Sequence, residues 1–238
     1  MAISSRIQVL SFLAGLTLAG SAVAASQPSQ GFVAHYQVTR GGQPLGTATL
    51  SLQLGANGLY RYTSEVDGSA GMAALLAASI NEESQFRWHH GGPESTEYHY
   101  RMQTAFKHRH RQMTVDWAQG QVSVDEGKGV QQYPARPGMV DHNLLLLAIG
   151  WNLQQGKSGA LALPVAVRQT VETEHFQISK DGSVSVPAGR FQTLRVDRSD
   201  PGKALSAWYA PDKFPLPVKL SQQEGGDIAM QLVDFKRQ

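Results

Sequence analysis

The stretches FVAHYQV (residues 32–38) and TLSLQL (residues 49–54) alternate apolar and polar side chains. A period of two is typical of β-strands that bury one face. In the first stretch that face consists of Phe32, Ala34, Tyr36 and Val38. Between the stretches lies RGGQPLG (residues 40–46), whose glycines accept the positive φ of a tight turn. The region therefore predicts an antiparallel hairpin.

The same rhythm continues along the chain. GANG (residues 55–58) is a second turn, and LYRYTSEV (residues 59–66) places Tyr60 and Tyr62 on one strand face. In the second half, short alternating runs are separated by the turn sequences KDG, PAG, DPGK and EGGD. Strands spaced about 8 to 12 residues apart are typical of sandwiches and barrels. We predict a mainly β fold, an antiparallel curled sheet or open (half) β-barrel.

Two stretches break this rhythm and predict two short apolar helices. AGMAALLAAS (Ala70–Ser79) is apolar on all sides. DHNLLLLAIGWNLQQG (Asp141–Gly156) begins with a potential N-cap and ends at a glycine. Because a helix that is apolar all round must be buried, we expect both helices to pack on or across the sheet.

The N-terminus has the layout of a secretory signal peptide: one cation at Arg6, an apolar run over residues 7–18, and the triplet Ala22–Ala24. We expect a signal peptide over residues 1–24 and a single β-rich domain over residues 25–238. The sequence has no cysteine, which excludes disulfides, thiolate metal sites and the lipidated cysteine of a bacterial lipoprotein. The expected protein is periplasmic, secreted through the inner membrane, and soluble, with no transmembrane segment after signal removal.

The charges argue against a nucleic-acid partner. The 21 Lys and Arg residues nearly balance the 19 Asp and Glu residues. A nucleic-acid surface needs cations clustered on one face, and this balance provides no such excess.

The stretch FKHRHRQM (residues 106–113) is the most suggestive chemically. Strand alternation from Tyr98 onward would point His108 and His110 inward, whereas Met113 belongs to the opposite phase. A bulge or turn is therefore required between Thr104 and Gln112. Two histidines that are two residues apart, even with His89, His90 or His99 from a neighbouring strand, lack the carboxylate or thiolate of a typical zinc site. We predict no metal site and no cofactor, and read the stretch as polar strand residues.

Sequence signatures of catalysis are absent. The chain has no Gly-x-Ser-x-Gly elbow, no His-Glu-x-x-His helix and no phosphate-binding glycine loop. Glu82 and Glu83 are adjacent on a strand, so they face opposite sides and cannot act together as acid and base unless the strand is bulged. We therefore assign no catalytic residue and consider an enzyme less favoured than a binding protein.

The order of several segments resembles the bacterial family "domain of unknown function 3108". The resemblance rests on HYQVTRGGQPLG, YRYTSEVDGSAGMAALL, EESQFRW, MVDHNLLLLAI, VPAGRFQTLRV and WYAPDKFPLPVKLSQQEGG. It implies an exported protein with one mostly antiparallel β domain and no established activity. The strand layout also looks like the open half-barrels of periplasmic lipoprotein carriers, which hold acyl chains. Within the last segment we expect Trp208 to be a core anchor.

Three functions remain open. The first is a non-catalytic binding or carrier module for an apolar or amphiphilic component of the cell envelope, with a pocket under the two helices. Its expected ligand-binding residues are Tyr60, Tyr62, Leu75, Leu76, Leu145 and Leu146. The second is a hydrolase of envelope polymers or lipids that uses His and Glu side chains, and the third is a purely structural envelope protein.

Overall fold

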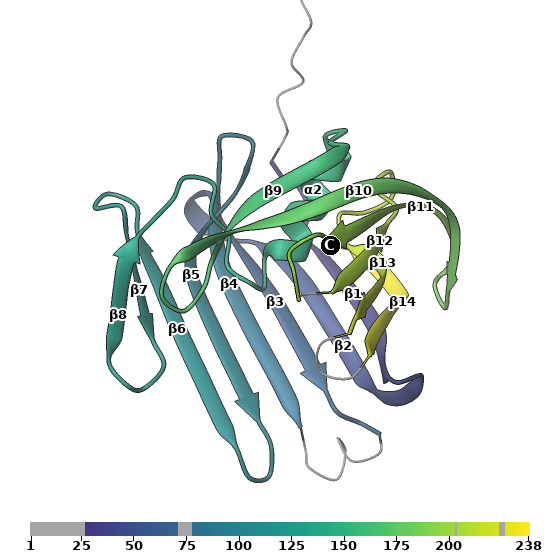
Figure 1. The fold of residues 1–238 in the computed structure, drawn as a ribbon, viewed down its shortest axis with the longest axis horizontal. Coiled ribbons are helices and arrows are strands. Elements are labelled where there is room, and N and C mark those ends of the chain that lie inside the picture. The colour runs from purple at the N-terminus through teal and green to yellow at the C-terminus, as the bar shows by residue number, and fades with distance from the viewer. Residues whose placement is uncertain (1–26, 71–77, 203, 224–226) are drawn as a thin grey trace, which may run out of the picture.

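The structure, a computed structural model, describes residues 27–70, 78–202, 204–223 and 227–238. These residues form one 14-stranded antiparallel sheet in the order β8-β7-β6-β5-β4-β3-β2-β1-β14-β13-β12-β11-β10-β9 (Figure 1). The strands are β1 (Phe32–Arg40), β2 (Gln43–Leu54), β3 (Leu59–Asp67), β4 (Ser79–His89), β5 (Gly92–Gln103), β6 (His108–Asp116), β7 (Gln121–Asp125), β8 (Val130–Pro134), β9 (Gly159–Ala166), β10 (Val171–Val186), β11 (Gly189–Arg198), β12 (Leu205–Tyr209), β13 (Pro217–Gln222) and β14 (Ile228–Arg237). A 3-10 turn, η1 (Ala56–Gly58), precedes β3, and the described residues contain one α-helix, α2 (Leu145–Gln154).

The first and last strands meet in the middle of the sheet. β1 pairs with β14 from Phe32↔Arg237 to Arg40↔Ile228, so the N-terminal and C-terminal halves of the chain lie side by side. β1 also pairs with β2 in the predicted hairpin, with Phe32 opposite Leu52. The predicted inner face of β1 is buried, as the alternation required; it consists of Phe32, Ala34, Tyr36 and Val38.

The sheet curls around α2 without closing into a barrel, and β8 and β9 are its end strands (Figure 1). The prediction of a mainly β, antiparallel, curled sheet is confirmed. Inside the curve lies the larger of two apolar cores, to which α2 and strands from both halves of the chain contribute.

The helix predictions are only partly correct. α2 is an apolar helix with most of its residues buried, as expected, but it begins at Leu145 and not at Asp141. Residues 142–144 form a turn instead, because the Asp141 carboxylate bonds two strand serines and the helix can start only after the chain has left them. Most of the other helix, expected over Ala70–Ser79, lies outside the described residues, and its last residue begins β4.

A break in the pairing of β5 divides the sheet into two regions. β6 pairs with β5 only from Glu97 to Gln103, and the pairing of β4 with β5 shifts register just before Glu97. β-bulges of this kind bend a strand and end its pairing. Before Glu97, β5 is no longer paired with β6, so β6, β7 and β8 diverge from the rest of the sheet at this end, and we call these three strands the flap.

A segment that we call the strap, Gly138–Leu144, lies where β6 has left β5. The Ser95 N–H of β5 donates to the Met139 carbonyl at 3.1 Å. On the other side, the Val140 N–H donates to Pro164 at 3.0 Å, and the Val140 carbonyl accepts from Ala166 at 2.8 Å. The strap thus links β5 to β9 across the curve of the sheet, with its backbone groups satisfied on both sides.

The flap has a small apolar core of its own. Its members come from β5 to β8, the strap and the neighbouring ends of β9 and β10; the buried ones are Tyr98, Met113, Val122, Val124, Tyr133, Met139, Ala166 and Val171. Outside the strands, the Trp117 indole N–H donates to the Ser95 carbonyl at 3.0 Å.

The phase change predicted between Thr104 and Gln112 is a turn. The Thr104 N–H donates to the Lys107 carbonyl at 2.9 Å, and Phe106 at the tip is 88% exposed. Because His108 lies opposite Gln103 and His110 opposite Arg101, both histidines are on the outer face and exposed. The prediction that His108 and His110 point inward is wrong, because the turn before them reverses the alternation that begins at Tyr98.

Trp208, expected to be a core anchor, packs against the larger core but is not one of its buried members. Its neighbours Ala207 and Tyr209 are buried, whereas Trp208 is half-buried on the opposite face of β12. There the Arg195 guanidinium lies 5.2 Å and the Lys219 ammonium 4.8 Å from the centroid of the Trp208 ring, distances typical of cation–π contacts.

Candidate functional site

The strap is anchored by a buried carboxylate. Asp141 is 1% exposed and accepts hydrogen bonds from Ser84 Oγ of β4 and Ser95 Oγ of β5, both at 2.7 Å. It also accepts from the Leu144 N–H at 3.1 Å, which satisfies a donor of the turn before α2. The Asp141 side chain therefore fixes the strap to β4 and β5 and stabilises the turn that leads into α2.

Burial raises the pKa of Asp141 to about 6, although the hydrogen bonds from Ser95, Ser84 and Leu144 favour the ionised form. Removing a carboxylate from water disfavours its charge, and here this effect exceeds the three hydrogen bonds. Asp141 is thus a buried acid that titrates above the ordinary carboxyl range.

Asn143 extends the network to β3. Its Nδ2 donates to Ser84 Oγ at 3.0 Å, and its Oδ1 accepts from Ser64 Oγ at 2.6 Å. A second anchor lies at the start of the strap, where the buried Glu94 carboxylate accepts from the Gly138 N–H at 2.7 Å and from Arg87. Burial would raise the pKa of Glu94, but these donors lower it.

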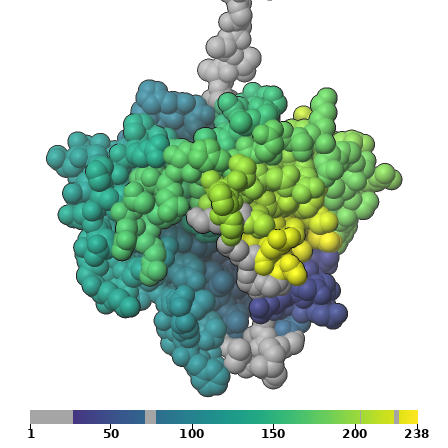
Figure 2. Space-filling view, in the orientation of Figure 1, coloured from purple at the N-terminus to yellow at the C-terminus, as the bar shows by residue number. Residues whose placement is uncertain are grey.

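A pocket of about 220 Å³ lies beside the start of α2, on the inner side of the sheet. Its walls come from β2, β3 and β4 on one side, from β10 to β14 on the other, and from the strap and α2. Most of the lining is apolar, and includes Leu50, Val66, Leu145, Leu146, Phe176, Leu205, Leu220 and Met230. In Figure 2 the inner strands are seen within a hollow, behind the green and yellow strands.

The polar groups in this wall are Tyr62, Ser64, Glu82, His142, Asn143, Arg198 and Gln222. Tyr62 is completely buried, and its hydroxyl has no hydrogen-bond partner among the described residues. Buried polar atoms are normally paired, so this hydroxyl is an unused group in the pocket wall.

The structure places the six expected ligand-binding residues differently. Tyr62, Leu145 and Leu146 line the pocket. Tyr60 is buried elsewhere, stacked on Phe86 with ring centroids 5.1 Å apart, and is not part of the wall. Leu75 and Leu76 lie outside the described residues.

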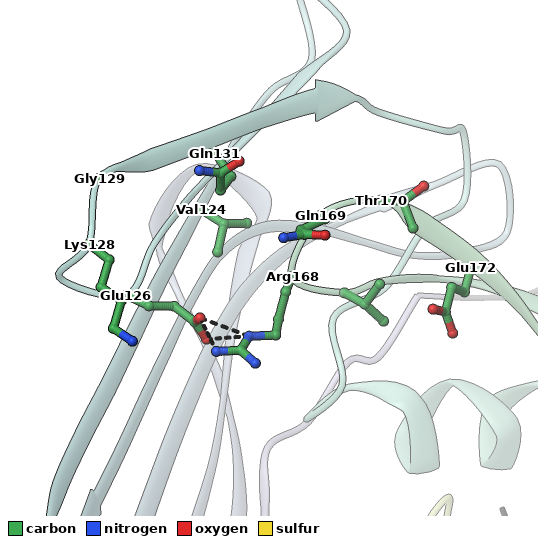
Figure 3. Close-up of a pocket in the computed structure, with 10 residues that line it drawn as sticks. Val124, Glu126, Lys128, Gly129, Gln131, Arg168, Gln169, Thr170 and Glu172 are labelled. Atoms are coloured by element: carbon green, nitrogen blue, oxygen red, sulfur yellow. Dashed lines mark hydrogen bonds and ion pairs between the residues drawn. The ribbon is translucent and has the colours of Figure 1, made fainter. Parts of the chain in front are cut away.

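Two larger recesses are less suited to an apolar ligand. One, about 670 Å³, lies between the β7–β8 turn and the residues before β10, and its walls are mostly polar (Figure 3). The other, about 730 Å³, is lined by four consecutive residues of β9, Ala160–Leu163. Since consecutive strand residues face opposite sides, that recess runs around the edge of the sheet and does not enclose a volume.

The acidic and histidine residues do not gather into a larger cluster. Among the described residues, no group of three or more His, Cys, Asp and Glu side chains has the arrangement to hold a metal ion. Glu82 accepts from the Tyr98 hydroxyl at 2.6 Å, whereas Glu83 lies 3.4 Å from Arg61. The two glutamates thus face opposite sides of β4, as their adjacent positions required.

The family profile described as "Protein of unknown function (DUF3108)" matches residues 35–233. The chain belongs to this family. The matched span runs from β1 to β14, so the strap, α2 and the pocket are all within the DUF3108 region. None of the curated proteins compared with the chain matches it.

A solved structure with a similar fold is the β-barrel-like protein of domain of unknown function DUF1849 from Brucella abortus. The TM-score is 0.51 at 10% sequence identity, and the alignment covers 88% of this chain and 98% of that chain. Similarity at this identity shows the fold alone. Within the described residues, no helix has the length and apolar character needed to cross a membrane.

Sequence reasoning missed the polar groups that shape the site. Ser84 and Glu82 share the inward phase of β4 with Phe86, and Arg198 continues the phase of Val196 in β11. These polar residues on the otherwise apolar, inward-facing side of a strand could have indicated the site, because a polar group facing the core needs a partner or a ligand. The pairing of Asp141 with Ser84 and Ser95 depends on tertiary contacts and had no local signal.

Proposed function

We propose that this DUF3108 protein is a non-catalytic binding or carrier module that holds an apolar or amphiphilic component of the cell envelope. The observation that carries the proposal is the pocket beside α2, which combines apolar walls with the unpartnered hydroxyl of Tyr62. Ligand sites are typically apolar concavities with a few polar groups that fix orientation.

The size of the pocket limits the ligand. Its volume of about 220 Å³ is below the ~300–1,000 Å³ of sites for drug-sized molecules. A single alkyl chain fits this volume better than a polycyclic or many-chained lipid. The polar group of such a ligand would lie near Tyr62 and Glu82, with the chain along the leucines of α2.

The proposed location is the periplasm, after removal of a signal peptide over residues 1–24. N-terminal sequencing of the protein from a periplasmic extract is expected to begin at Ala25 or within a residue or two. Full-length protein retained in the cytosol would contradict this part of the proposal.

Native mass spectrometry of the full chain purified under mild conditions from its own envelope tests the binding function. We expect a co-purifying apolar or amphiphilic molecule, with lower occupancy in Val66→Trp, because Val66 lines the pocket. The matched control is Glu65→Trp, on the same strand but exposed. Absence of any bound molecule, together with no uptake of added alkyl probes, would favour the structural hypothesis.

A further inference from the structure

The charged groups of the pocket suggest which amphiphiles it accepts, if the proposed binding function holds. Among the described residues, its wall contains one carboxylate, Glu82, one guanidinium, Arg198, and the imidazole of His142. A pocket for fatty acids would need a cation that is free to pair with the ligand. Whether Arg198 is free therefore decides the class of ligand.

Arg198 is already paired with two carboxylates. Its Nη2 lies 2.8 Å from Glu174 Oε1, and its Nε lies 3.0 Å from Asp200 Oδ2. The side chains of Arg198 and Glu174 are only 10% and 4% exposed, so water screens this pair weakly. Among the described residues, two carboxylates already share this one cation, so a third carboxylate at Arg198 would be repelled by both.

Glu174 has unused capacity to accept a hydrogen bond. Its Oε2 is buried and has no hydrogen-bond partner in the part of the chain that the structure describes. A buried carboxylate oxygen in this state favours a donor or a cation nearby and disfavours another anion.

The opposite wall is also negative. Glu82 lines the pocket and uses one oxygen to accept from Tyr98, and the buried Asp141 lies behind this wall. Burial, and after it the charges of Glu82 and Asp141, raise the pKa of Tyr62. The Tyr62 hydroxyl thus stays protonated and can donate to a ligand oxygen.

We infer that the pocket selects single-chain amphiphiles with a neutral hydrogen-bonding group or a cationic group over those with a carboxylate. A ligand hydroxyl can accept from Tyr62 and donate to Glu82. A ligand ammonium can pair with Glu82. A ligand carboxylate would lie beside Glu82, near the Glu174–Arg198 pair and the buried Asp141, and the described residues of the wall offer it no Lys or Arg that is not already paired.

The test compares three ten-carbon probes, decanol, decylamine and decanoate, for binding to the full chain by calorimetry at about pH 8. Decanol and decylamine are expected to bind at least about tenfold more tightly than decanoate, a difference that the wild-type protein alone can show. Decanoate that binds as tightly as the others, or more tightly, would overturn the inference while leaving the proposed function intact. Failure of all three probes to bind would overturn the proposed function itself.

Three single-residue variants, one of them a control, test which wall groups cause the preference. Glu82→Gln is expected to weaken decylamine and strengthen decanoate by several-fold, about three- to tenfold each. Glu83→Gln is the matched control, since the same change is made one residue away on the outer face. Equal effects of Glu82→Gln and Glu83→Gln would contradict the placement of the ligand's polar group beside Glu82.

Tyr62→Phe is expected to weaken the binding of decanol alone, because it removes the hydroxyl donor and keeps the ring.

Discussion

The flap and the rest of the sheet have the same antiparallel strands but cover their inner faces in different ways. The larger region packs on α2, which enters its core with large apolar side chains. The flap packs on its own strands, Tyr98 of β5, Met139 of the strap, and the end residues Ala166 of β9 and Val171 of β10. A strand that loses its neighbour must find another apolar surface, and here the strap provides it. The stability of the larger region should therefore depend on the helix, and that of the flap on the strap and on the contacts at its edge.

The largest expected effect is at the contact between α2 and the loop before β13. A Cβ atom added to Gly150 would lie 1.6 Å from the carbonyl oxygen of Pro215, a backbone atom that cannot rotate away. Gly150→Ala should destabilise the protein by more than about 4 kcal/mol, although alanine is the better helix former. The measurement is chemical denaturation.

Gly92→Ala is the control for this prediction, because a Cβ atom there would meet nothing within 4 Å. It should change the free energy of unfolding by no more than about 0.5 kcal/mol. A stable Gly150→Ala variant would show that α2 is free to shift within the sheet, and the helix would then not be the fixed support of the larger region.

The next prediction compares one core residue from each region. Leu147 of α2 is 0% exposed, and Met113 of the flap is 2% exposed. Each truncation to alanine should cost about 3 kcal/mol in the region where it is made. Leu147→Ala should reduce amide hydrogen-exchange protection throughout the sheet, whereas Met113→Ala should reduce it mainly in β6, β7 and β8. If Met113→Ala also reduced protection in β1 to β3 to the same extent, the sheet would unfold as one unit and the division would be wrong.

A third prediction concerns the strap. The pKa of Asp141 is raised from 3.8 to about 6 by burial, so the folded protein binds this proton more tightly than the unfolded chain. Its contribution to stability is therefore greatest below about pH 4 and is lost as the pH rises through about 6.

Carboxyls with lowered pKa values, such as Glu94 and Asp200, act in the opposite direction, so the comparison is made with a variant. Relative to Asp141→Asn, the wild-type protein should gain about 2 kcal/mol of stability between pH 7 and pH 4. Urea denaturation at several pH values measures this difference. A difference that does not change with pH would mean that Asp141 titrates in its ordinary range and that burial does not control its charge.

The two regions also differ in how far the sequence predicts them. Alternation correctly identified the buried face of β1, because a hairpin pairs residues close in sequence and each strand shows its own period. The flap could not be predicted, since it begins where β5 bulges and where the distant strap replaces β6. Such a choice between two partners for one strand edge depends on tertiary contacts.

The pocket shows the same limit. The leucines of α2 were recognised because an apolar helix must be buried, and Tyr62 because it shares the inward phase of β3. Tyr60 has the same phase but lies farther along the strand, where it stacks on Phe86 instead. Phase gives the face on which a residue lies but not its depth, so it cannot distinguish a core residue from a pocket residue.

The smallest effects are expected where the flap meets the loop before β10. Among the described residues, the Tyr133 hydroxyl donates to the Val167 carbonyl at 2.5 Å. The Arg168 guanidinium pairs with Glu126, with Nε at 2.8 Å from Oε2, as Figure 3 shows. Tyr133 is 7% exposed, whereas the Arg168 side chain is 66% exposed. Tyr133→Phe should cost about 1 kcal/mol, because it leaves a carbonyl without its donor. Arg168→Ala should have a smaller effect that decreases as salt is added, since water and ions screen an exposed pair. Amide hydrogen exchange in β7 and β8 measures the effects of both variants.

If Arg168→Ala reduced exchange protection in these strands more than Tyr133→Phe, and did so equally at high salt, the surface ion pair and not the buried contact would hold the edge of the flap.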